Sequence, residues 1–61
     1  MNTTLYQYNF TDTFGNIYET VGISEQHDVE RKILTITKLD GLVTPTSYVS
    51  SFTKTRLMQS R

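Results

Sequence analysis

The amino-acid sequence predicts a mainly β fold, a small antiparallel sheet or open barrel of about four to five strands. Three observations predict it. Short runs of alternating apolar and polar residues have the two-residue period of a strand. Turns that contain glycine and asparagine separate these runs. A chain of 61 residues is long enough for one domain, so we expect residues 1–61 to form a single unit.

The first two predicted strands form a hairpin. The run 5–10 alternates, and its aromatic residues share one face of a strand: Tyr6, Tyr8 and Phe10. The segment 12–16 is a turn, because its glycine and asparagine tolerate positive φ. The run 17–23 is the returning strand, and three of its apolar residues share a face: Ile17, Val21 and Ile23.

The polar segment 24–31 allows two interpretations, between which the sequence does not decide. In the first it is a short helix, capped by Ser24 and supported by the four-residue spacing of Asp28 and Lys32. In the second it is a connection with at most a turn or two of helix.

The next hairpin is predicted over residues 32–45. The run 32–39 is its first strand, with Ile33 and Leu39 on one face and Leu34 and Ile36 on the other. Apolar residues on both faces favour a central strand or one that meets a partner subunit. Asp40 and Gly41 form a strong hairpin-turn signal. Leu42 begins the returning strand, which Pro45 ends or places at a sheet edge.

Residues 46–58 can be read as a strand or as a C-terminal helix that Pro45 opens in its first turn. Serine and threonine crowd the segment, and both are unfavourable inside a helix. Val49 and Thr53 favour a strand. We therefore expect a strand and keep the helix as the alternative.

The length of the chain favours self-association. A domain of this size buries only roughly 60% of the surface that its unfolded chain exposes. It has no cysteine for a disulfide, and a single histidine without cysteine does not suit a structural zinc site. We expect a homo-oligomer, with a dimer favoured, and no cofactor or metal.

Charge is separated along the sequence. Residues 1–30 carry five acidic residues, whereas residues 31–61 carry six cationic residues and one acidic residue. The two halves therefore have net charges of −5 and +5. These charges can neutralise each other within one subunit or between subunits. We favour the first, because neighbouring strands touch in any sheet.

The residue types do not suit an enzyme or a membrane protein. Ser24, His27 and Asp28 are the types found in nucleophilic catalysis, but closeness in sequence does not create that geometry. The first residues lack the basic and apolar regions of an export signal, and no apolar run is long enough to cross a bilayer. We expect a non-enzymatic, cytoplasmic protein.

What remains is a binding protein. We expect a module that inhibits or regulates another protein, a role common among phage and mobile-element accessory proteins of this size. Aromatic residues and arginines are its candidate partner-binding residues, because both types carry interface energy: Tyr6, Tyr8, Phe14, Tyr18, Arg31, Tyr48, Phe52 and Arg56.

Two further hypotheses stay open. The first is a small β-barrel that binds single-stranded nucleic acid, because aromatic residues that alternate on a strand can stack on bases. Tyr6, Tyr8 and Phe10 have this spacing, although a place in the core or in an interface is the favoured interpretation. The second is a structural assembly subunit.

Overall fold

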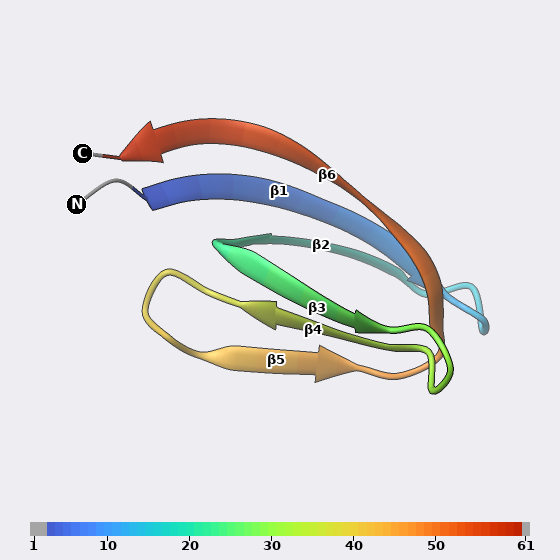
Figure 1. Cartoon of the computed structure of the whole chain (residues 1–61). Helices are drawn as coiled ribbons and strands as arrows, with labels where there is room; N and C mark the ends of the chain where they lie inside the picture. The colour runs from blue at the N-terminus through green and yellow to red at the C-terminus, as the bar shows by residue number, and fades with distance from the viewer. Residues whose placement is uncertain (1–2, 61) are drawn as a thin grey trace.

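The computed structural model describes residues 3–60, with side chains for residues 3–57, and consists of six strands in two antiparallel sheets (Figure 1). The strands are β1 (Thr3–Asp12), β2 (Ile17–Gly22), β3 (Ser24–Asp28), β4 (Ile33–Thr37), β5 (Val43–Thr46) and β6 (Val49–Ser60). The first sheet has the order β2-β1-β6 and the second the order β3-β4-β5. The predicted mainly β fold is confirmed, and the two sheets do not close into a barrel.

The hairpin of β1 and β2 is confirmed. Phe10 pairs with Tyr18 and Tyr8 pairs with Thr20, so these four residues share the face of the first sheet that looks toward the second. Gly15, in the turn, has a φ of +89°, a conformation that glycine adopts without a steric penalty. The outer face of β2 carries the exposed Ile17 and Val21, so most of the apolar face predicted for this strand points to solvent.

The chain passes from the first sheet to the second at Gly22 and Ile23. The Ile23 amide donates to the carbonyl of Thr37 at 2.8 Å, which ties the corner to β4. A Cβ on Gly22 would lie 2.6 Å from Cγ2 of Ile36. Glycine at this position therefore lets the two sheets approach each other closely.

Strand β3 corrects both interpretations of residues 24–31, because residues 24–28 form neither a helix nor a loop. The segment alternates as a strand does, but Glu25 and His27 are the residues that point inward. Both are polar, so no apolar period marks the strand in the sequence. Their side chains are satisfied by partners on other strands, with Tyr8 bonded to Glu25 and the Val49 carbonyl bonded to His27.

The hairpin of β4 and β5 is confirmed. The central strand of the second sheet is β4, and its Leu34 and Ile36 are buried. Gly41, in the turn, has a φ of +87°. Pro45 lies on β5, an edge strand, where its missing N–H costs no ladder hydrogen bond. Leu39 belongs to the turn and is 63% exposed.

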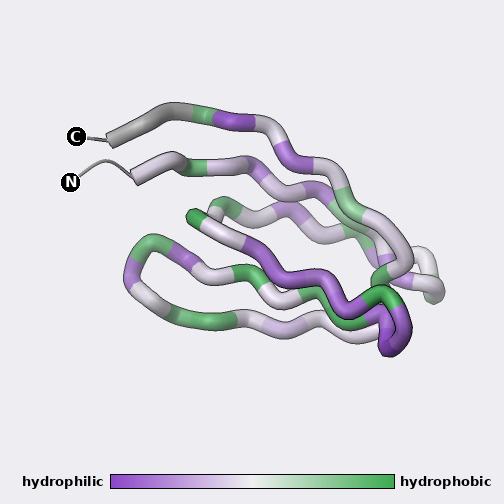
Figure 2. Tube along the Cα trace, viewed as in Figure 1, coloured by the Kyte–Doolittle hydropathy of each residue, from purple (hydrophilic) through white to green (hydrophobic). Residues whose placement is uncertain are grey.

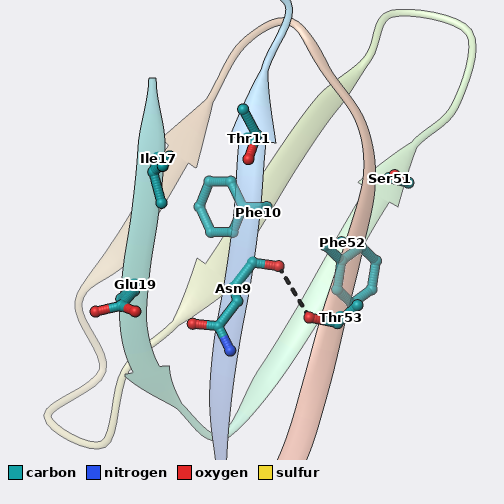
Figure 3. A pocket seen from close by; sticks show the side chains of 8 residues that line it. All are labelled: Asn9, Phe10, Thr11, Ile17, Glu19, Ser51, Phe52 and Thr53. Atoms are coloured by element: carbon teal, nitrogen blue, oxygen red, sulfur yellow. Dashed lines mark hydrogen bonds between the residues drawn. The ribbon is translucent and has the colours of Figure 1, made fainter. Parts of the chain in front are cut away.

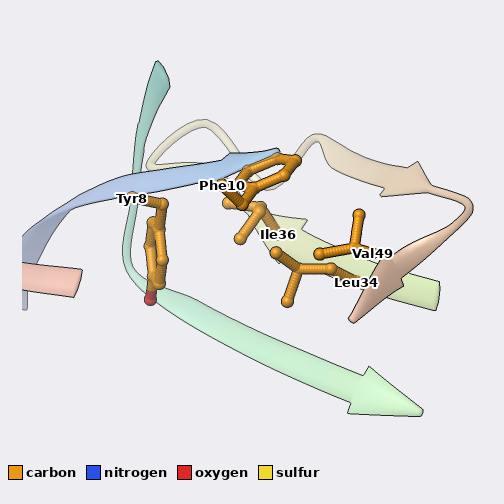
Figure 4. Close-up of a cluster of buried hydrophobic side chains, with 5 residues drawn as sticks. All are labelled: Tyr8, Phe10, Leu34, Ile36 and Val49. Carbon is orange, nitrogen blue, oxygen red and sulfur yellow. The ribbon is translucent and has the colours of Figure 1, made fainter. Parts of the chain in front are cut away.

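The strand predicted within residues 46–58 is confirmed, because residues 49–60 form β6. The alternative of a C-terminal helix is wrong. It pairs with β1 along its length, with Phe52 opposite Phe10 and Lys54 opposite Tyr8. The core is small and lies where the two sheets face each other (Figure 4). Its buried residues are Tyr8, Phe10, Leu34, Ile36 and Val49.

Hydrophobic segments are not confined to this core. Figure 2 shows them also on the turn between β4 and β5, at the end of the molecule opposite the β1–β2, β3–β4 and β5–β6 connections. Among residues 3–60 the structure has no helix long and apolar enough to cross a membrane.

Candidate partner-binding surface

Three connections meet at one end of the molecule, which we call the aromatic end: residues 13–16, 29–32 and 47–48 (Figure 1). The Thr13 amide donates to the carbonyl of Tyr48 at 3.0 Å, and the Val49 amide donates to the carbonyl of Lys32 at 2.7 Å. These two backbone hydrogen bonds join the three connections to one another. The aromatic end is therefore a cross-linked unit and not a set of independent loops.

Phe14 and Tyr48 form an exposed aromatic pair on this end. Their ring centroids lie 5.2 Å apart in an edge-to-face arrangement, with 79° between the ring planes. Phe14 is 72% exposed and Tyr48 is 55% exposed. The contact fixes two large apolar rings in one orientation while most of their surface stays open to solvent.

The backbone of Tyr48 adopts a conformation that bulky residues rarely take. Its φ is +65°, in the left-handed region, which costs an L-residue roughly 1–2 kcal/mol. The neighbouring hydrogen bonds to Thr13 and Lys32 hold it there. Strained residues of this kind cluster at functional sites. The strain therefore singles out Tyr48 among the exposed aromatic residues.

Asp12 organises the turn that carries Phe14. Its Oδ1 accepts hydrogen bonds from the amides of Phe14 and Asn16, and its Oδ2 accepts from Asn16 Nδ2 and the Tyr18 hydroxyl, all at 2.9–3.0 Å. These bonds, above all the one from the Asn16 side chain, hold the pKa of Asp12 below its usual value. The bond to Asp12 raises the pKa of Tyr18. A single carboxylate thus fixes the conformation of residues 12–18.

A polar network links the two sheets away from this end. The Tyr8 hydroxyl and Lys54 Nζ both donate to Oε1 of Glu25, each at 3.0 Å. Lys54 Nζ also lies 4.7 Å from the centre of the Tyr6 ring. Burial, reinforced by the hydrogen bond to Glu25, raises the pKa of Tyr8 well above its usual range. The network therefore fastens β3 to β1 and β6.

His27 makes a further link between the sheets. Its Nε2 lies 2.8 Å from the carbonyl oxygen of Val49, and because a carbonyl can only accept, Nε2 carries the proton. Its ring meets Phe52 edge-to-face at 5.6 Å. The contacts place this histidine in a structural role between β3 and β6.

Two ion pairs join the acidic and the basic half of the sequence within one chain. Lys54 from the basic half pairs with Glu25 from the acidic half within one chain. Arg31 Nε lies 4.0 Å from Asp28 Oδ2 across the boundary between the halves. The turn between β3 and β4 therefore holds both signs of charge side by side.

The structure brings only part of the predicted partner-binding set to the surface. Tyr8 is fully buried, so its ring cannot reach a partner while the fold is intact. Tyr6, Tyr18 and Phe52 are half-buried and pack against the core. The exposed members are Phe14, Tyr48, Arg31 and Arg56. Of these, Phe14 and Tyr48 contact each other.

Sequence reasoning missed two residues that build this surface, Asp12 and Lys32, and one that links the two sheets, Glu25. Asp12 was part of the turn signal, but its four hydrogen bonds need the folded turn. Lys32, whose carbonyl anchors Val49, itself has a positive φ of 58°, and its sequence carries no glycine-like signal. Glu25 is not among the predicted site residues, yet its carboxylate accepts two hydrogen bonds between the sheets.

A shallow hollow of about 360 Å³ lies on the outer face of the first sheet (Figure 3). It is lined by Asn9, Phe10, Thr11, Ile17, Glu19, Ser51, Phe52 and Thr53. Thr53 Oγ1 donates to the Asn9 carbonyl at 3.3 Å, which uses part of its polar lining. Glu19 is the only titratable residue among those eight.

Among the described residues, no group of three or more His, Cys, Asp or Glu side chains could hold a metal ion. The exposed aromatic pair is thus the strongest candidate site that the geometry offers. No protein-family model, curated protein or solved structure matches the chain.

Proposed function

We propose that the protein is a non-enzymatic module that binds a second protein through Phe14 and Tyr48. The observation that carries the proposal is the geometry of this pair: two exposed rings in edge-to-face contact, one of them on a strained backbone. Large exposed apolar groups mark interaction sites, and aromatic residues are enriched among the residues that dominate binding energy.

The rigidity of the aromatic end supports the proposal. Binding costs about 0.5–1.5 kcal/mol for each flexible side chain that becomes ordered. Asp12 fixes the turn beneath Phe14, the Thr13 amide donates to the Tyr48 carbonyl, and the Val49 amide donates to the Lys32 carbonyl. The backbone that carries both rings is therefore preorganised, so less of the contact energy is lost to ordering it.

The surroundings of the pair indicate the chemistry of the partner. Val29, on the turn between β3 and β4, is 71% exposed, and Arg31 on the same turn is exposed as well. A complementary surface would offer an apolar pocket for the rings and a carboxylate at its rim for Arg31. We infer that the module inhibits or regulates this partner in the cytoplasm, in the manner of small accessory proteins.

Single-stranded nucleic acid has less support as a ligand. Base stacking on a strand needs exposed rings. Tyr8 and Phe10 are buried in the core, and Tyr6 is half-buried beneath Lys54. The acidic Glu25 beside Lys54 further weakens the attraction to phosphate.

Co-purification from a host lysate at low salt tests the proposal. We expect the wild-type protein to retain one protein species and the double variant Phe14→Ala/Tyr48→Ala to lose it. Leu57→Ala is the matched control, because Leu57 is also exposed, at 52%, but lies on β6 outside the aromatic end. Retention of the same protein by the double variant would contradict the proposal. So would a retained species that nuclease treatment removes.

A further inference from the structure

At the other end of the molecule an apolar hollow stays open to solvent. It has a volume of about 580 Å³ and is lined by Leu5, Val21, Lys38, Leu39 and Asp40. These residues come from β1, β2 and the turn between β4 and β5, and we call this region the leucine end. Two more exposed apolar residues, Leu42 and Val43, follow directly on the same turn and strand.

The exposed area of the chain is larger than its mass predicts. The chain exposes 4527 Å², whereas a compact monomer of 7.1 kDa exposes about 4,100 Å². The leucine end carries four of the exposed large apolar residues: Val21, Leu39, Leu42 and Val43. Contiguous exposed apolar surface of this kind is typical of a protein interface.

The charges on the rim indicate what kind of surface fits this end. Leu39 stands between a cation, Lys38, and an anion, Asp40, and all three line the hollow. A two-fold axis through Leu39 would bring Lys38 of each copy opposite Asp40 of the other, with the two Leu39 side chains between them. A surface with this pattern is complementary to itself, which is the requirement for a contact between identical subunits.

We propose that the leucine end is the contact between two copies of the chain, related by a two-fold axis, with Leu39 at its centre and Lys38 and Asp40 forming pairs across it. The turn is built to present Leu39: the Lys38 amide donates to the Leu42 carbonyl at 2.8 Å, and Asp40 Oδ1 accepts from the Leu42 amide at 2.9 Å. The hairpin therefore holds the three residues in place before association.

The proposal is independent of the aromatic end. The leucine end and the aromatic end lie at opposite ends of a molecule that is 38 Å long and 16 Å in its other two dimensions (Figure 1). A dimer formed through the leucine end leaves both aromatic pairs free and pointing apart. Such a dimer would be bivalent, and its apparent affinity for a partner with two sites would exceed that of a monomer.

Sedimentation velocity over a wide concentration range tests the dimer. We expect the wild-type protein to convert from monomer to dimer as its concentration rises. Leu39→Ser removes the central contact, and Lys38→Glu places like charges across the axis. We expect each variant to raise the dissociation constant about tenfold or more. Val29→Ser, which changes an apolar residue of similar exposure at the aromatic end, leaves the constant unchanged.

Charge reversal gives a second readout. An equimolar mixture of Lys38→Glu and Asp40→Lys pairs opposite charges again, so we expect it to form heterodimers at concentrations where each variant alone is monomeric. The far-ultraviolet circular dichroism of every variant checks its fold.

A wild-type protein that stays monomeric at millimolar concentration, or that forms large open assemblies, overturns the proposal. Equal weakening by Val29→Ser and Leu39→Ser overturns it as well. The double variant Phe14→Ala/Tyr48→Ala should dimerise normally, which separates this test from that of the partner surface.

Discussion

The two ends of the molecule are built differently. At the aromatic end, hydrogen bonds from Thr13 and Val49 cross-link three connections, and Asp12 fixes the turn below Phe14. At the leucine end, a single hairpin turn borders an apolar hollow. Leu39, which lines this hollow, is mostly exposed to solvent. The comparison teaches that exposed apolar residues have two meanings in this fold. At one end they are carried by connections that are joined to one another, and at the other they are presented by a single hairpin turn beside an open hollow.

The largest expected effect separates core leucine from surface leucine. Leu34→Ala empties a fully buried site, and we expect it to lower the free energy of unfolding by about 2–5 kcal/mol. Leu39→Ala, the same chemical change in the turn, should change the free energy of unfolding of the monomer by about 0.5 kcal/mol or less. Urea denaturation in dilute solution measures both. Equal losses would contradict the placement of Leu39 outside the core.

The next effect concerns the Asp12 carboxylate, which holds the turn at the aromatic end. The pKa of Asp12 is lower in the folded state than its ordinary value of 3.8. The carboxylate therefore contributes to stability at pH values above 3.8, and this contribution is lost as the pH falls through the folded-state pKa. Asp12→Asn should therefore destabilise the protein at neutral pH and lose less stability than the wild type on acidification. Thermal melts across the acid range compare the two. Parallel pH profiles would show that Asp12 is not the responsible group.

A smaller effect is expected from the network between the two ends. Tyr8→Phe keeps the buried ring but removes the hydroxyl that donates to Glu25. We expect a loss of about 1 kcal/mol in the free energy of unfolding, since the carboxylate keeps Lys54 as a partner. A double-mutant cycle with Lys54→Met should show coupling between the two donors. Additive effects would mean that they do not share the Glu25 oxygen in solution.

An effect of similar size to that of Tyr8→Phe isolates the strain at Tyr48. Both Tyr48→Gly and Tyr48→Ala remove the ring, but only glycine takes a φ of +65° without a steric penalty. We expect the glycine variant to be more stable than the alanine variant by about 1 kcal/mol. At Val43, on an edge strand at the other end, the same two substitutions should show the opposite order. The same order at both positions would place Tyr48 in an ordinary conformation.

The sequence predicts the fold where side-chain chemistry and period agree. Alternation places Tyr8 and Phe10 on one face of β1, and the glycine turns locate both hairpins. Strand β3 could not be found in this way, because its inward residues Glu25 and His27 become compatible with burial only through partners on other strands. The outward direction of Ile17 is equally hidden, since it depends on which face of the hairpin meets the second sheet.

The candidate site is predictable only in part. Phe14 and Tyr48 are visible as aromatic residues in polar segments, which is why both belong to the predicted partner-binding set. Their contact depends on the backbone bond between Thr13 and Tyr48, which joins segments that are 35 residues apart in sequence. Tyr8 was assigned to the same set because an alternating strand does not show which of its rings the second sheet covers.

The division between the two ends can be tested in one measurement. Amide ¹H–¹⁵N spectra recorded from low to high protein concentration report which residues change environment on self-association. We predict that the signals of Val21, Leu39 and Leu42 shift with concentration, whereas those of Phe14 and Tyr48 stay fixed. Concentration-dependent shifts at Phe14 and Tyr48, with the leucine end unchanged, would contradict the account and make the aromatic pair the self-association surface.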